Sequence, residues 1–174
     1  LVLNGEHDAE KWYCIGRKWL EDRAQSLVEM DGSFSQYSVT YHRLMLDTYS
    51  FVEVWRRKHE LLAFSAVLIK RMQKAAEWLF QMVQPSSGDA PNLGANDGAR
   101  ILPITNTGYR DFRPSVQLGM AVFNQSLAYS EDGDWNLPLR WLEQNIPTAE
   151  ATKPHSTQFP DGGYSLLSKG SGFV

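Results

Sequence analysis

The stretch SAVLIKRMQKAAEWLFQMV at residues 65–83 decides the class of fold. Its apolar residues recur three or four positions apart, and this spacing predicts an amphipathic helix. Lys70, Lys74 and Glu77 fall between them and are expected to face water. The predicted buried stripe consists of Leu68, Met72, Ala75, Ala76, Leu79 and Phe80.

The same spacing predicts helices on both sides of this stretch. They cover residues 8–30, 38–58, 114–129 and 137–145. Short links favour antiparallel helical hairpins, and strands do not alternate with helices as in a parallel-sheet protein. Residues 164–167 are predicted to form a first β-strand. The predicted fold class is therefore all-α, with antiparallel helical hairpins and the start of a β-element.

Two further predictions name residues that are expected to be buried. In the helix at 38–58, one apolar side is predicted from Leu44, Thr48, Phe51, Val52 and Trp55. Tryptophans at helical spacing are mostly expected in the core, because large aromatic side chains are usually well buried. These are Trp12, Trp19, Trp55, Trp78 and Trp141.

Composition excludes several classes of protein. The 174 residues are 43% hydrophobic and 21% charged, which is typical of one globular domain. The net charge of −3 argues against a nucleic-acid partner. The single Cys14 excludes an intramolecular disulfide and a cysteine-based zinc cluster. No uncharged apolar run approaches the roughly 20 residues that span a bilayer, so no membrane partner is expected. The HExxH, GxSxG and phosphate-loop motifs are absent, so no metal or cofactor is expected.

Residues 84–113 form a long segment rich in Gly, Pro, Asn and Asp. A structureless loop of this length is uncommon inside a domain and is usually functional. Its arginines suit a carboxylate or a sulfate, because the guanidinium donates two parallel hydrogen bonds. Alternatively, Asp97 with Arg100, or Asp111 with Arg113, ties the loop to itself. The candidate substrate-binding residues here are Asn96, Arg100, Tyr109 and Arg113.

Four segments in order carry a resemblance. They are GRKWLEDRAQSLVEMDGSFSQYSVTYHRLMLD at 16–47, GANDGAR at 94–100, DFRPS at 111–115 and FPDGGYSLL at 159–167. Together they resemble the heparinase II/III family of polysaccharide lyases over nearly the whole chain. That family combines an incomplete (α/α) toroid with a β-sandwich. The resemblance implies that residues 1–150 are the C-terminal part of a toroid and that residues 151–174 are a linker and the beginning of the sandwich.

The resemblance also implies a reaction, β-elimination at a uronic acid of an anionic polysaccharide. A base removes the C5 proton, an acid protonates the oxygen leaving from C4, and the carboxylate is neutralised. The matching tyrosine is Tyr41, which is implied to be catalytic, and Gln36 is implied to hydrogen-bond a sugar hydroxyl. His42 is a candidate substrate contact, but it lies about 100° around the helix from Tyr41, which also favours a structural role.

The other catalytic groups of that family fall outside the matching segments. The resemblance implies a neutralising Asn upstream and a base His beyond Val174, with Asn4 and His155 as poor substitutes. The chain is therefore expected to be part of a longer protein in the periplasm or secreted. Its terminal helices would then expose apolar faces and favour self-association. The expected exposed residues are Trp12, Ile15, Trp19, Leu139 and Leu142.

Two other functions stay open. A glycoside hydrolase on a similar toroid needs two carboxylates at a set separation, with Asp31, Asp97 and Asp111 as candidates. A non-catalytic carbohydrate-binding or capsule-assembly relative needs no acid at all. In that case Tyr41 is an aromatic residue on a helix face, with its hydroxyl in water.

Overall fold

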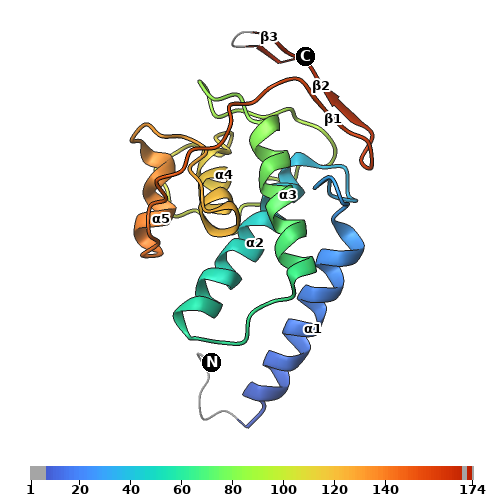
Figure 1. Ribbon diagram of the computed structural model, residues 1–174, viewed down its shortest axis with the longest axis vertical. Coiled ribbons are helices and arrows are strands. Elements are labelled where there is room, and N and C mark those ends of the chain that lie inside the picture. Colours follow the sequence, from blue (N-terminus) through green and yellow to red (C-terminus); the bar gives the residue numbers. More distant parts are fainter. Residues whose placement is uncertain (1–6, 170–171, 174) are drawn as a thin grey trace.

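The computed structural model describes residues 7–169 and 172–173. Helices make up most of its ordered structure, with small antiparallel β-hairpins near the C-terminal end (Figure 1). The helical elements are α1 (Ala9–Leu27), α2 (Val39–Lys58), α3 (Ala66–Met82), α4 (Arg113–Gly119), the π-helical turn η1 (Met120–Asn124), the 3-10 turn η2 (Asp134–Asn136) and α5 (Leu137–Trp141). The strands are β1 (Thr157–Phe159), β2 (Tyr164–Leu166), β3 (Ser168–Lys169) and β4 (Gly172–Phe173).

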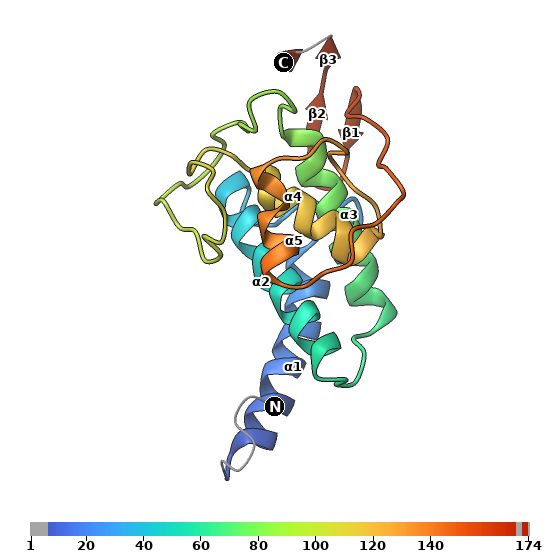
Figure 2. The same ribbon diagram turned by 90° about the vertical axis from the view of Figure 1, so that its left-hand side faces the viewer.

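Helix α3 is the centre of the fold. The chain reverses direction between α1 and α2 and again between α2 and α3 (Figures 1 and 2). Helix α3 packs against α1, α2, α4 and η1. Its predicted stripe is confirmed, because all six members are buried: Leu68, Met72, Ala75, Ala76, Leu79 and Phe80. The prediction of a largely helical chain is confirmed as well.

The ends of the long helices follow local signals. Ser38 and Ser65 cap α2 and α3, each with a hydroxyl oxygen that accepts a backbone N–H from the first turn, at 3.1 and 3.2 Å. The predicted helix at 8–30 ends earlier, at Leu27. Val28 is extended and pairs with Phe34 across a tight turn. Gly32 in that turn has φ +94°, and the Lys74 carbonyl leaves no space for a Cβ.

The predicted helix at 114–129 is wrong in its second half. Helix α4 passes into η1, which ends where Gln125 takes a left-handed conformation with φ 53°. The amides of Ala128 and Tyr129 then donate to Oε1 of the buried Gln117, both at 3.0 Å. A buried amide side chain from the preceding helix thus takes the donors that a continuing helix would use. The predicted helix at 137–145 is also too long, since α5 ends at Trp141.

The strand predicted at 164–167 exists as β2, but it is not the first. It pairs antiparallel with β1, with Thr157 opposite Leu166 and Phe159 opposite Tyr164. This hairpin packs on the end of α3, where Trp78 contacts Tyr164 with ring centroids 5.2 Å apart. Asp31 holds the hairpin turn by accepting the amides of Asp161 at 2.8 Å and Gly162 at 3.2 Å.

The buried face of α2 is not the predicted one. Of the expected apolar side, Phe51 is exposed and the other members are only half-buried. The buried face instead carries several polar side chains that find partners inside the fold. It consists of Val39, Thr40, His42, Arg43, Met45, Leu46, Asp47, Tyr49, Ser50, Glu53 and Val54.

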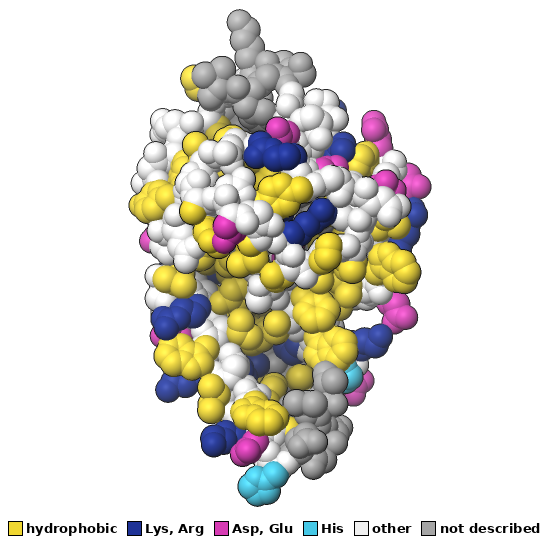
Figure 3. Space-filling view, turned by 180° about the vertical axis from the view of Figure 1, so that it is seen from behind, with side chains coloured by type: hydrophobic (Ala, Val, Ile, Leu, Met, Phe, Trp, Pro, Cys, Tyr) yellow, Lys and Arg dark blue, Asp and Glu magenta, His cyan; other side chains and the backbone are white. Residues whose placement is uncertain are grey.

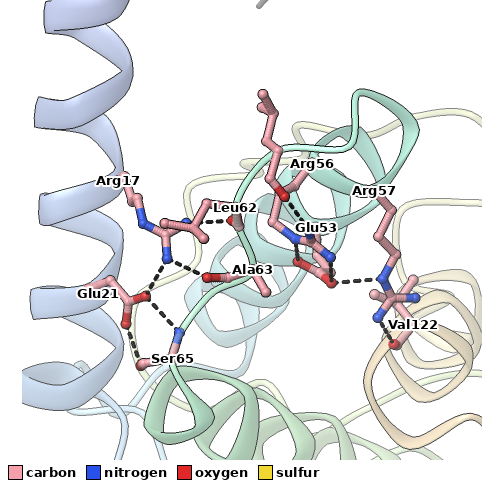
Figure 4. A network of polar contacts seen from close by, with 10 residues as sticks. Arg17, Glu21, Glu53, Arg56, Arg57, Leu62, Ala63, Ser65 and Val122 are labelled. Carbon is pink, nitrogen blue, oxygen red and sulfur yellow. Dashed lines mark hydrogen bonds and ion pairs between the residues drawn. The ribbon is translucent and has the colours of Figure 1, made fainter.

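Two polar networks tie the helices together (Figure 4). In the first, Arg17 of α1 donates to the carbonyls of Leu62 at 2.7 Å and Ala63 at 2.5 Å. Glu21 of the same helix accepts the Ser65 amide at 2.8 Å, at the positive end of the α3 dipole. These bonds join α1 to the link between α2 and α3.

The second network joins α2 to η1. The buried Glu53 accepts hydrogen bonds from Arg56 at 2.7 and 3.0 Å and from Arg57 at 2.7 Å. Arg57 also donates to the Val122 carbonyl at 2.8 Å. Arg56 and Arg57, at the basic end of α2, are therefore engaged within the fold.

Aromatic and aliphatic side chains are exposed on α1, as expected for its terminal face. Trp12, Ile15 and Trp19 are 51%, 46% and 50% exposed. The expectation that most of the five tryptophans at helical spacing are core residues is therefore wrong. Trp12, Trp19 and Trp141 are exposed, Trp55 is half-buried and Trp78 is buried. The expectation for α5 is wrong in the other direction, because Leu139 is fully buried and Leu142 is half-buried.

An apolar groove runs between α1 and the second half of α2. Figure 3 shows apolar and basic side chains together over this end of the molecule. Its lining includes Trp12, Tyr13, Leu20, Phe51, Trp55 and Phe64.

Among the helices in the described part of the chain, none has the length and apolar character needed to cross a bilayer. Within residues 7–169 and 172–173, no three His, Cys, Asp or Glu side chains form a group that could hold a metal ion. Asn4 lies outside the described residues.

Candidate functional site

The first turn of α2 and the long loop meet at Tyr41. Its hydroxyl donates to Oδ2 of Asp97 at 2.8 Å, across 56 positions of sequence. Tyr41 is half-buried, whereas Asp97 lies in the exposed run at 91–98. The fold therefore brings together two of the segments that the sequence singled out.

Hydrogen bonds to the backbone of the loop hold it beside Tyr41. The Ser38 hydroxyl donates to the Ala95 carbonyl at 2.6 Å, and the Val39 amide donates to the Leu93 carbonyl at 3.2 Å. Gly94, with φ +70°, lies so close to the Tyr37 carbonyl that a Cβ would have no space. The loop is seen projecting beside the start of α2 in Figure 2.

Asn96 and Tyr109 complete the cluster. The Tyr109 hydroxyl donates to Oδ1 of Asn96 at 2.6 Å. Asn96 in turn donates from Nδ2 to Oδ1 of Asn92 at 2.7 Å. Three of the sequence-predicted residues, Tyr41, Asn96 and Tyr109, therefore lie on one polar surface around Asp97.

The two arginines predicted to bind substrate, Arg100 and Arg113, are turned to the loop itself. Arg113 pairs with Asp111 at 2.8 Å and lies over the Trp135 ring at 4.2 Å, which confirms the self-tying alternative for this pair. Arg100 donates to the Thr107 carbonyl at 3.2 Å. Because Asp97 accepts from Tyr41, the alternative pairing of Asp97 with Arg100 is not the contact seen. Arg100 remains half-buried.

Gln36 and His42 lie in opposite environments. Gln36 is exposed just before α2, so it is free to meet a ligand. His42 is fully buried, its Nε2 contacts the Ala75 carbonyl at 2.9 Å, and its ring stacks on Trp78 at 4.4 Å. The prediction of His42 as a substrate contact is therefore wrong, and its structural reading is confirmed. Burial lowers the pKa of His42 to about 4.

The hydrogen bond between Tyr41 and Asp97 reinforces the ordinary protonation states of both groups. It raises the pKa of Tyr41 above its ordinary value, because the carboxylate favours the neutral phenol. The same bond, helped by the Ala99 amide, lowers the pKa of Asp97. At neutral pH Tyr41 therefore carries a proton and Asp97 a negative charge. This arrangement suits a proton donor and does not suit a tyrosinate base.

Sequence reasoning missed Arg43 and Asp47, which lie beneath this surface. Both are buried, at 1% and 3% exposure. Burial raises the pKa of Asp47 to about 7, although Ser115 and the nearby Arg43 and Arg100 oppose this shift. The available signal was the spacing of two opposite charges one turn apart within RLMLD.

Comparison with protein-family models, with curated proteins and with solved structures finds no match for the chain. Function is therefore inferred from the chemistry of Tyr41, Asp97 and the loop that carries Asp97.

The pH dependence of stability tests the burial of two separate side chains, Asp47 and His42. The pKa of Asp47 in the folded protein, about 7, lies above the ordinary aspartate value of 3.8. Ionisation of Asp47 therefore lowers stability as pH rises from about 4 to about 7. The folded pKa of His42, about 4, lies below 6.5, so His42 lowers stability as pH falls through the same range. The two effects oppose each other, and a shallow pH dependence is expected.

Asp47→Asn is expected to remove the first effect and leave the second. The free energy of unfolding should then rise by on the order of 2 kcal/mol between pH 4.5 and 6.5. Urea unfolding at several pH values measures this slope, with the unsubstituted chain as the control. If the free energy of unfolding of the variant depends on pH as weakly as that of the unsubstituted chain, these side chains titrate normally.

Proposed function

We propose that this chain supplies the proton-donating part of a polysaccharide lyase site, which cleaves uronic-acid-containing polysaccharides by β-elimination. The observation that carries the proposal is the Tyr41 hydroxyl, which donates to Asp97 of the exposed polar loop at 2.8 Å. The resemblance of the sequence to heparinase II/III lyases led to Tyr41, and the geometry around it supports the same role.

The proposed chemistry uses Tyr41 as the general acid. As the bond from C4 to the glycosidic oxygen breaks, Tyr41 transfers its proton to that oxygen. The tyrosinate formed would lie beside the Asp97 carboxylate, and the repulsion between two negative charges favours prompt reprotonation. Asp97 is thus proposed to keep the phenol protonated before the reaction. Its own carboxylate is ionised, so the proton that Tyr41 regains afterwards comes from solvent.

The sugar is proposed to bind along the loop. Sugar hydroxyls are recognised by amide and hydroxyl groups. Such groups are presented here by the exposed Gln36 and Asn96 and by the half-buried Tyr109. Arg100 is the proposed cationic contact for the uronate, once released from the Thr107 carbonyl. We propose that the base and the neutralising amide come from outside the chain, and that the protein acts in the periplasm or is secreted.

A hydrolase is not favoured by the carboxylates. Asp31 is occupied by three backbone amides, from Ser33, Asp161 and Gly162. Asp111 is paired with Arg113. Of these candidates only Asp97 faces the loop surface, whereas glycoside hydrolysis requires two carboxylates across the scissile bond.

Absorbance measurement on the complete gene product tests the proposal. Incubation with alginate, hyaluronan, heparan sulfate or chondroitin sulfate is expected to generate ultraviolet absorbance from a new C4–C5 double bond. Reducing sugar without this band would indicate hydrolysis. Binding without either product would indicate a carbohydrate-binding protein.

We also propose that the exposed face of α1 associates with the same face of a second copy of the chain. Trp12, Ile15 and Trp19 are about half exposed, and apolar patches of this kind usually mark interfaces. The chain is expected to show concentration-dependent association in sedimentation, and Trp19→Glu is expected to weaken it. Lys11→Glu, which changes charge on the same helix without removing an apolar side chain, is the control. A monomer at all concentrations would contradict self-association.

A further inference from the structure

We infer that Arg43 is the positioning residue that holds the long loop so that Asp97 reaches Tyr41. The inference rests on the proposed function for its consequence in catalysis, but its geometry stands on the fold alone. Arg43 begins the second turn of α2, two positions after Tyr41, and its side chain points beneath the loop.

Arg43 joins the two arms of the loop. Nη1 donates to the Tyr109 carbonyl at 2.7 Å, and Nη2 donates to the Ala99 carbonyl at 3.3 Å. These carbonyls are ten positions apart in sequence, so one guanidinium joins the two ends of the loop segment between them. A lysine has a single ammonium group on a flexible stem and does not reproduce this fork.

Aromatic rings enclose the same guanidinium. Its carbon lies 4.5 Å from the centroid of the Tyr109 ring and 4.3 Å from that of the Phe112 ring. Both rings belong to the returning arm of the loop. Stacking therefore fixes the orientation of the planar group while its edges bind the carbonyls.

Asp47 acts electrostatically on this buried group. It lies one turn further along α2. Burial lowers the pKa of Arg43, and the attraction of Asp47 opposes that shift. Arg100 and Tyr109 also face Arg43 from the loop.

The two carbonyls lead directly to the candidate site. The Ala99 amide donates to Oδ1 of Asp97 at 3.0 Å, so fixing Ala99 fixes the turn that presents Asp97. The Tyr109 hydroxyl holds Asn96 at 2.6 Å. Loss of Arg43 is thus expected to release Asp97 from Tyr41, although Arg43 itself touches neither residue by a hydrogen bond.

The pKa of Tyr41 is the readout, because a merely structural role would not change it in a folded protein. Tyrosine labelled with ¹³C at Cζ gives one NMR titration curve per phenol, and Tyr41→Phe identifies the Tyr41 curve. Asp97→Asn removes the carboxylate and defines the pKa of Tyr41 without its partner. Arg43→Lys is expected to lower the pKa of Tyr41 to the same value while circular dichroism stays unchanged.

A second variant covers the case in which Arg43→Lys does not fold. Arg43→Met combined with Asp47→Leu removes both buried charges together, a replacement that is often neutral for stability. It should also lower the pKa of Tyr41, whereas Asp47→Asn alone, which keeps Arg43, should not. A folded variant without Arg43 in which the pKa of Tyr41 stays raised would overturn the inference.

Turnover separates this inference from the proposed function. In the complete gene product, Arg43→Lys is expected to reduce kcat by roughly tenfold, through misplacement of groups that Arg43 does not itself supply. A pKa of Tyr41 that depends on Arg43 in a protein without lyase activity would remove the proposed function and leave the positioning role. Full turnover with a lowered pKa of Tyr41 would show that Asp97 is not needed at Tyr41.

Discussion

Trp78→Ala is expected to lower the free energy of unfolding by about 3–5 kcal/mol, the usual range when a buried tryptophan is truncated. Trp78 is 1% exposed at the end of α3. It stacks on His42 at 4.4 Å and contacts Phe159 and Tyr164 of the β-hairpin at 6.0 and 5.2 Å. The substitution therefore opens a cavity where α2, α3 and the hairpin meet.

Two matched substitutions control for the loss of a tryptophan. Trp141→Ala, at a side chain 71% exposed, is expected to change stability by less than about 0.5 kcal/mol. Trp78→Phe should cost less than Trp78→Ala, because it retains part of the ring volume and the Trp78 indole N–H has no partner among the described residues. Urea unfolding followed by circular dichroism measures all three. Similar losses for Trp78→Ala and Trp141→Ala would contradict the position given to Trp78.

Tyr41→Phe is expected to reduce the turnover of the complete gene product by roughly 10²-fold or more. The change removes the proton that the leaving oxygen needs and keeps the ring. Substrate affinity should stay largely intact, because the other groups along the loop remain. Initial rates of ultraviolet absorbance, with binding measured by calorimetry on an unreactive oligosaccharide, separate the two effects.

Tyr13→Phe on α1 is the matched control and should leave turnover unchanged, since Tyr13 lines the apolar groove and not the polar surface around Tyr41. His42→Ala is expected to act through stability, because His42 is buried against Trp78. Equal and mild effects of Tyr41→Phe and Tyr13→Phe would assign Tyr41 a structural role. The carbohydrate-binding alternative would then explain the polar loop better than a lyase does.

Local patterns in the sequence were sufficient for the scaffold. The stripe of α3, the starting positions of α2 and α3 and the irregular course of residues 84–112 all follow from neighbours within a few positions. Helix periodicity and capping depend on contacts between residues three or four apart, so they are visible in a single sequence. The segments that meet at the candidate site were also recognisable, through the resemblance and through the unusual loop.

The limits of local reasoning appear at α4 and α2. Apolar spacing continued the fourth helix to residue 129, but Gln117 captures the amides of Ala128 and Tyr129. On α2 the apolar residues predicted the wrong face. Its buried face includes Arg43 and Asp47, which look like solvated charges until their distant partners are known.

The sequence by itself therefore determined which segments are helical, where the central helices begin, and which loop carries polar groups. Only the tertiary structure decided that Tyr41 meets Asp97, that His42 is enclosed against Trp78, and that Arg43 closes the loop. Each of these contacts joins residues more than 30 positions apart. Burial and pairing across such separations are set by how helices pack together, and the pattern of one segment does not contain its partner.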